Sequence, residues 1–164
     1  MKMMWKKMKK TVAAGLAAVM VLGLAGCGNS NSDIDIDPVA LADDMKASVT
    51  FQDQLSEVEL DKVLSLYGID SGIVDSGKAY LSTNATAEEI AVIKAKTAED
   101  VDTGTTAVQN RVASQLQSFE SYNANEVPKL ENPVIETAGT CVILCVCDDK
   151  GEAEAVIDSY TAAK

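Results

Sequence analysis

The sequence contains no histidine in its 164 residues, and this absence removes much of the chemistry open to a small protein. Without imidazole there is no Ser-His or Cys-His nucleophilic pair, no histidine general base and no histidine-ligated zinc. Aromatic residues make up only 4% of the chain, so the core has to be built from Val, Ile, Leu and Ala. The sequence therefore predicts a protein that is not an enzyme, with no cofactor and no metal.

Basic residues are also scarce, with 14 Lys and Arg against 25 Asp and Glu. Five of the lysines lie within the first ten residues, so the 138 residues that follow residue 26 carry 9 basic and 25 acidic side chains, a net charge of −16. Such a surface repels the phosphates of nucleic acids and the headgroups of anionic lipids. We expect no nucleic-acid partner and no membrane attachment through a basic patch.

The first 26 residues are typical of a secretory signal peptide. The cationic start is followed by an apolar run from Val12 to Leu24 that is too short to span a bilayer. The next residues, Leu24-Ala25-Gly26-Cys27, resemble a lipobox, the cleavage and lipidation signal of bacterial lipoproteins. The resemblance implies cleavage before Cys27 and a thioether from its sulfur to diacylglycerol, with Leu24, Ala25 and Gly26 as the cleavage motif. We expect a lipid-anchored, extracytoplasmic protein on the outer face of the cytoplasmic membrane.

Residues 27–37 are predicted to be the lipidated cysteine and a flexible tether, ahead of a single domain at 38–164. The ten residues 28–37 are small, polar and acidic, and they reach at most ~35 Å. Asp33, Asp35 and Asp37 alternate as in a calcium loop, but the glycine and the distant glutamate of such a loop are missing. We therefore expect no metal site in the tether.

Capping signals and apolar periodicity predict four helices. The first begins at Pro38 with Asp37 as its N-cap. The second begins at Ser56, where Glu59 would complete a capping box, and Gly68 ends it. The others are expected at 105–122, with a stripe of Val108, Val112, Leu116, Phe119 and Tyr122, and after Asp148-Asp149 at the C-terminal end.

Alternation and β-branched content predict four strands, at 78–82, 89–96, 133–137 and 140–147. A helix would also accommodate 89–96, and its Ile and Val content together with the preceding turn favour a strand. The last strand is apolar on both faces, which is typical of a central, covered strand. The predicted fold class is α+β: a four-stranded, mostly antiparallel sheet of two β-hairpins, each followed by a helix, with an N-terminal helix pair packed on it.

Cys141, Cys145 and Cys147 are the residues that most suggest metal or redox chemistry. Same-face neighbours two apart on a strand lie nearly 7 Å from each other, at the limit of disulfide geometry. A thiolate metal site would need a fourth ligand and a loop, so we interpret the three as small buried hydrophobes. Three free thiols in an exported protein indicate a reducing or anaerobic habitat.

Arg111 and Gln115 are the weak candidates for ligand binding, since they lie one turn apart beside the apolar stripe of the long helix. As a functional pair they would hold a carboxylate. As structural residues they would form a helix flank that pairs with the acidic surface, and this second interpretation is favoured.

Several short segments together resemble an uncharacterised family, domain of unknown function family 4358. They are Leu66-Tyr67-Gly68, the segment 89–96, the helix residues Arg111, Gln115, Phe119 and Tyr122, and the segment 139–149. The similarity covers roughly residues 44–160. It implies an envelope lipoprotein of Gram-positive, largely anaerobic bacteria, and it supplies no reaction, ligand or catalytic residue. Cysteine at 141 and 147 departs from the family pattern, which argues against a family role for the thiols.

The leading hypothesis is therefore a lipid-anchored, non-catalytic domain that binds an envelope protein or a small ligand. The alternative is a carboxylate-dependent hydrolase of cell-wall polymers, because two acids with separated pKa values suffice for glycoside hydrolysis. The acid pairs of the sequence lie at predicted helix starts or turns, where capping and solvation explain them. A solute-binding component of a transporter is disfavoured because one small domain lacks two lobes.

Overall fold

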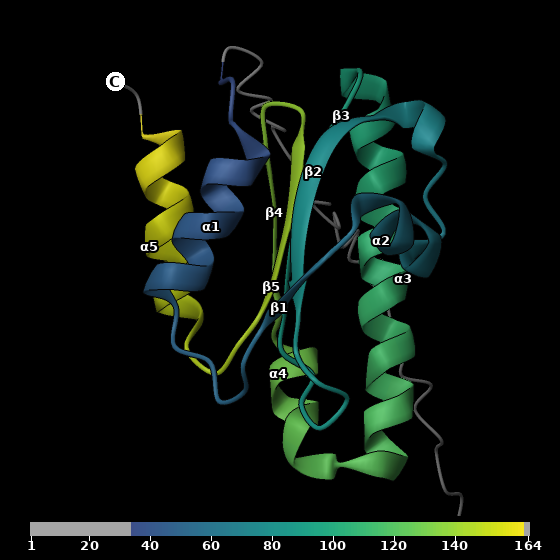
Figure 1. Cartoon of the computed structure of the whole chain (residues 1–164), viewed down its shortest axis with the longest axis vertical. Coiled ribbons are helices and arrows are strands. Elements are labelled where there is room, and N and C mark those ends of the chain that lie inside the picture. The colour runs from purple at the N-terminus through teal and green to yellow at the C-terminus, as the bar shows by residue number, and fades with distance from the viewer. Residues whose placement is uncertain (1–33, 163–164) are drawn as a thin grey trace, which may run out of the picture.

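A computed structural model describes residues 34–162, in which a five-stranded antiparallel sheet lies between two layers of helices (Figure 1). The strand order is β1-β2-β3-β5-β4. The strands are β1 (Ser56–Val58), β2 (Val74–Leu81), β3 (Glu89–Ala95), β4 (Val134–Ala138) and β5 (Cys141–Val146). The α-helices are α1 (Pro38–Ser48), α2 (Leu60–Tyr67), α3 (Ala98–Tyr122), α4 (Val127–Glu131) and α5 (Lys150–Thr161), with short 3₁₀ turns η1 (Ser71–Ile73) and η2 (Ala124–Glu126).

The described residues leave out part of what the sequence predicts. The proposed signal peptide, the motif Leu24, Ala25 and Gly26, the lipidated Cys27 and most of the tether lie outside them. No helix of residues 34–162 is long and apolar enough to cross a membrane.

The mixed helix and sheet class is confirmed, together with the two hairpins. Hairpin β2–β3 is followed by α3 and hairpin β4–β5 by α5, and β3 pairs with β5 in the middle of the sheet. The predicted count of four strands is wrong, because β1 adds a fifth at the edge, where Ser56 pairs with Leu81 and Val58 with Ala79.

The strand β1 replaces the predicted first turn of the second helix. Helix α2 begins only at Leu60, and its N-cap Glu59 makes no side-chain capping bond, so the predicted capping box does not form. Pairing with β2 supplies Ser56–Val58 with backbone partners that a local helix signal cannot reveal. The predicted helix end is confirmed, since Gly68 takes the left-handed conformation with φ 68°.

The two N-terminal helices do not pack as a pair, contrary to the prediction. Helices α1 and α5 cover one face of the sheet, while α2 and α3 cover the other (Figure 1). The edge strand β1 lies between α1 and α2 in the chain, and the chain passes from one face of the sheet to the other at this edge. Helix α1 therefore buries its apolar side in the cluster that it shares with α5, and α2 in the cluster that it shares with α3.

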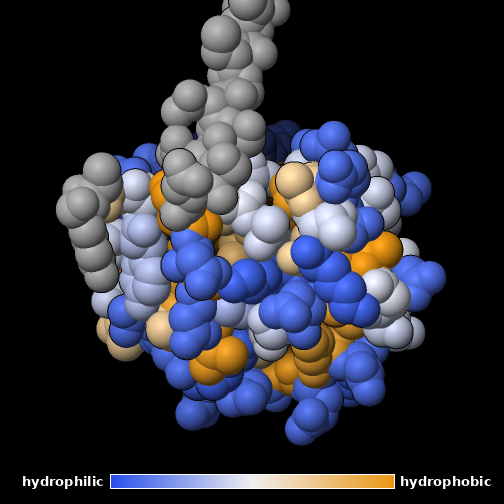
Figure 2. Space-filling view, turned by 90° about the horizontal axis from the view of Figure 1, so that it is seen from above, coloured by the Kyte–Doolittle hydropathy of each residue, from blue (hydrophilic) through white to orange (hydrophobic). Residues whose placement is uncertain are grey.

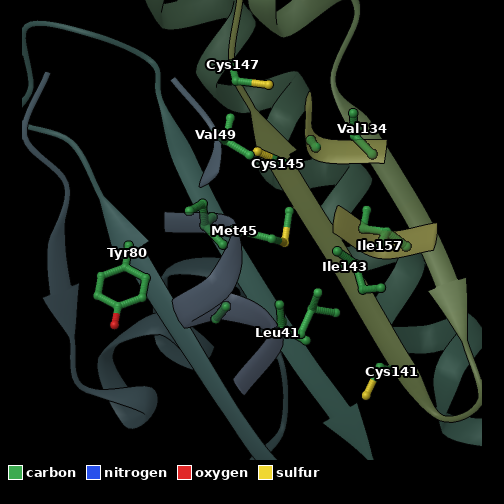
Figure 3. Packing of buried hydrophobic residues seen from close by; sticks show 14 of the residues in the cluster. Leu41, Met45, Val49, Tyr80, Val134, Cys141, Ile143, Cys145, Cys147 and Ile157 are labelled. Atoms are coloured by element: carbon green, nitrogen blue, oxygen red, sulfur yellow. The ribbon is translucent and has the colours of Figure 1, made fainter. Parts of the chain in front are cut away.

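Strand β5 is buried on both faces, as its composition predicts. Cys141, Ile143 and Cys145 pack with Leu41 and Met45 of α1 and with α5, as Figure 3 shows. The alternate residues Val142, Leu144 and Val146 pack under α2 and α3. Cys141, Cys145 and Cys147 are free and buried, so the predicted burial is confirmed.

Helix α3 is longer than predicted, because it begins at Ala98 with Thr97 as N-cap instead of near Thr105. Its stripe is buried at Val108, Val112 and Phe119 and ends there, since Tyr122 is 68% exposed. The predicted loop at 123–132 contains η2 and α4. The caps predicted for the first and last helices are confirmed, with Asp37 accepting from Val39 N at 2.9 Å and Asp149 from Gly151 N at 2.9 Å.

The described chain enters at the end of the sheet where the β4–β5 turn lies. Gly139 in that turn has φ 57°, and a Cβ there would overlap the carbonyl oxygen of Ile34. Lys94 Nζ lies 2.5 Å from the carboxylate of Asp35 and donates to the carbonyl of Ile36 at 3.3 Å. Figure 2 views this end, where hydrophilic side chains prevail over scattered apolar ones. The segment from Ile34 to Ile36 is thus bound to the end of β3 through Lys94 and packs closely against the β4–β5 turn.

Candidate functional site

A pocket of about 390 Å³ lies at the opposite end of the sheet, between the β2–β3 turn and the last turns of α3. The turn contributes Ser82, Thr83, Asn84 and Thr86 to one wall. Helix α3 contributes the other wall, and the start of β3 lies between the two. The lining residues from these last two elements are Glu88, Glu89, Arg111, Gln115, Ser118, Phe119 and Tyr122.

Three distant side chains hold the β2–β3 turn in place. Asp53 accepts from the backbone N of Thr83 at 3.0 Å and from its hydroxyl. Asn123, the C-cap of α3, donates to the carbonyl of Ala85 at 3.1 Å, and the carboxylate of Glu126 accepts from Ala87 N at 2.9 Å. Because the turn is fixed from two segments that are far apart in the sequence, the pocket is formed before any ligand arrives.

Arg111 and Gln115, the candidates from the sequence, both line this pocket and both face Glu89. Arg111 donates to the Glu89 carboxylate through Nη2 at 2.9 Å and through Nε at 3.4 Å, and Gln115 lies at 3.5 Å. The pair therefore does hold a carboxylate, but that carboxylate belongs to the protein. The favoured interpretation of Arg111 as pairing with surface acids is corrected, because Glu89 is only 2% exposed.

A buried tyrosine completes the contacts of Glu89. The hydroxyl of Tyr67 donates to Glu89 at 2.5 Å, and the Arg111 guanidinium lies 5.8 Å from the centre of the Tyr67 ring. Burial, followed by the negative charge of Glu89, raises the pKa of Tyr67 well above its ordinary value, so the phenol stays a proton donor. Glu89 is thus a fully partnered carboxylate that joins α2, β3 and α3.

Glu88 points into a second buried network. Its carboxylate accepts from the backbone N of Gln52 at 2.9 Å and of Asp53 at 2.8 Å, and it pairs with Lys129 Nζ at 3.0 Å. Lys129 also pairs with Glu126 at 3.1 Å. Burial lowers the pKa of Lys129, but the hydrogen bonds that its ammonium donates to Glu88 and Glu126 outweigh this effect, so the net pKa is raised and the ammonium stays charged.

Sequence reasoning missed these two networks. It placed Glu88 and Glu89 in a solvated turn, whereas they are 1% and 2% exposed. One signal was available, because Glu88 and Glu89 stand at the start of a strand that is apolar on both faces, and buried charges need partners. The partner Lys129, 41 residues further on, follows from no local pattern.

The cysteines lie away from the pocket, on the face covered by α1 and α5. Cys141 Sγ donates to the carbonyl of Ile36 at 3.8 Å. Within residues 34–162, no three His, Cys, Asp or Glu side chains are placed to hold a metal ion.

Comparison with family models matches residues 47–147 to "Domain of unknown function (DUF4358)". Comparisons with curated proteins and with solved structures give no match.

Proposed function

The chain belongs to the DUF4358 family, and we propose that it is a lipid-anchored envelope lipoprotein whose domain binds a small ligand in the pocket between the β2–β3 turn and α3. The observation that carries the proposal is the fixed pocket itself. Its volume lies within the range of small-molecule sites, about 300–1,000 Å³. Three side chains from two other segments hold its outer turn, although that turn contributes little to either hydrophobic cluster.

The contacts of the two pocket carboxylates favour binding over the alternative of a wall-polymer hydrolase. Glycoside hydrolysis needs one carboxyl group as a proton donor and a second as a nucleophile or base, both facing the substrate. Glu88 and Glu89 instead bind Lys129 and Arg111 inside the protein. Carboxylates that are already paired with cations serve as supports for the walls of the pocket.

The envelope address rests on the lipobox resemblance, and one substitution tests it. We expect that Cys27→Ala in the native host will abolish incorporation of labelled palmitate and leave the signal peptide attached, because the thioether forms at this sulfur. The measurement is metabolic labelling followed by fractionation, with Cys141→Ala as the matched control that keeps the label. A wild-type protein found unlabelled in the cytosol would contradict the anchoring part of the proposal.

Blocking the pocket tests its role in binding. We expect Ser118→Trp to fill the space between the turn and α3, because Ser118 is exposed on α3 and lines the pocket. Native mass spectrometry of the full lipoprotein purified from its host should show a retained small molecule in the wild type and at least a tenfold lower occupancy in the variant.

The matched control for this blocking is Gln117→Trp, which places the same ring on an exposed residue of α3 that does not line the pocket. It should leave the retained molecule in place. Equal occupancy in wild type and Ser118→Trp, or the absence of any retained molecule in the wild type, would count against ligand binding.

A further inference from the structure

We infer that the ligand of this pocket is a neutral, hydroxyl-rich ring of the kind that a pyranose sugar presents, stacked on Tyr122. The inference rests on the proposed binding function and adds the chemical class of the ligand. Three features of the pocket carry it: its compensated charges, its uncharged hydrogen-bonding groups and its exposed aromatic ring.

The charged groups of the pocket already have partners inside the protein. Glu89 is paired with Arg111 at 2.9 Å, and Glu88 with Lys129 at 3.0 Å. A cationic ligand would have to compete with these cations for the carboxylates. An anionic ligand would have to compete with Glu89 for Arg111, in a protein whose overall charge is strongly negative. A neutral ligand meets neither cost.

Uncharged polar groups line much of the remaining wall, beside the apolar side chains of Leu81 and Phe119. The hydroxyl of Ser82 donates to the carbonyls of Thr83 and Thr86, and that of Ser118 donates to the carbonyl of Ser114. Their oxygens keep lone pairs that accept from a ligand hydroxyl. The amide of Asn84, exposed at the tip of the turn, offers both a donor and an acceptor. Hydroxyl groups of a sugar act as donor and acceptor alike, so they match this set.

Tyr122 adds an apolar surface at the rim. It is 68% exposed although aromatic residues are scarce in the chain, and it is the one member of the α3 stripe that the core does not use. The buried ring of Phe119 meets it edge to face, with centroids 5.9 Å apart and planes at 74°. This contact orients the Tyr122 ring. A pyranose ring has C–H faces that stack on such a surface and hydroxyl edges that reach the polar walls.

The experiment is an NMR titration of the ¹⁵N-labelled mature protein with three neutral disaccharides: cellobiose, lactose and N,N′-diacetylchitobiose. Glucuronate and glucosamine serve as the anionic and cationic probes. At least one neutral disaccharide should shift the amide signals of residues 82–86 and 115–122, and it should bind more tightly than either charged sugar.

Substitutions then assign the contact to the ring. Tyr122→Ala should weaken binding about tenfold, whereas Tyr122→Phe, which keeps the aromatic face, should retain most of the affinity. Tyr160→Ala is the matched control, because Tyr160 lies on α5 outside the pocket and its loss should leave the affinity unchanged.

Other outcomes overturn the inference. They are the absence of shifts with all three disaccharides, tighter binding of a charged sugar, or equal affinity of Tyr122→Ala and wild type. If Ser118→Trp nevertheless releases a retained molecule, the pocket still binds a ligand and only the saccharide assignment fails. If Ser118→Trp changes nothing as well, both proposals fail.

Discussion

Replacing Lys129 by methionine is expected to lower the free energy of unfolding by about 3–5 kcal/mol, the cost of breaking a buried ion pair by removing one partner. The side chains of Lys129, Glu88 and Glu126 are 3%, 0% and 5% exposed. Methionine keeps most of the apolar length of lysine, so the loss of stability comes from the missing charge. Two buried carboxylates then face each other without the cation between them, at a cost that solvent cannot relieve.

Urea denaturation of wild type and variant measures the effect. The matched control is Lys150→Met, since Lys150 is 44% exposed and lies 3.9 Å from Glu154, where an ion pair contributes less than about 1 kcal/mol. A loss no greater than that of the control would contradict the assignment of Lys129 as the centre of the network.

The stability of the protein is expected to fall by about 2 kcal/mol between pH 9 and pH 11 through one thiol, at 1.36 kcal/mol per pKa unit. Burial raises the pKa of Cys141 from its ordinary value of 9.0 to about 11, although nearby Lys94 opposes the shift. In this window the unfolded chain loses the thiol proton while the folded chain keeps it. Proton release therefore favours unfolding as the pH rises, and below pH 9 this contribution is constant.

The measurement compares urea midpoints under reducing conditions at pH 8.5, 9.5 and 10.5. Other groups titrate here too, so the difference between variants carries the result. Cys141→Ala should be less stable at pH 8.5 because a buried side chain shrinks, and its further decline with pH should be shallower than that of the wild type. Val142→Ala, which truncates a buried neighbour but keeps the thiol, should decline as steeply as the wild type. Parallel slopes in all three proteins would refute the prediction.

Local patterns were sufficient to predict the hairpins, the central strand and most helix ends. The apolar run 141–146 identified β5, Gly68 identified the end of α2, and Asp37 and Asp149 identified helix starts. The same local rules failed for Ser56–Val58, where pairing with a strand some 20 residues further along the chain outweighed a capping signal. They also could not place α1 and α2 on opposite faces, because that follows from the position of β1 in the sheet.

The candidate site was accessible from the sequence only through α3. Arg111 and Gln115 were found because one helical turn separates them, and Tyr122 because it continued an apolar stripe. Their common partner Glu89 lies 22 and 26 residues earlier, and it was assigned to solvent. The side chains that fix the β2–β3 turn come from two segments, one before and one after the turn in the chain. Such convergence depends on tertiary structure, so no single window of sequence contains it.

With the proposed lipid anchor on Cys27, the contact between Gly139 and the backbone of Ile34 would give the domain a membrane-proximal and a membrane-distal pole. Only seven residue steps separate Ile34 from Cys27, so a lipid on Cys27 holds this pole within ~25 Å of the bilayer. Strand β3 spans ~20 Å, from Ala95 near this pole to Glu89 beside the pocket. The proposed anchor would thus join the domain at the pole opposite its pocket.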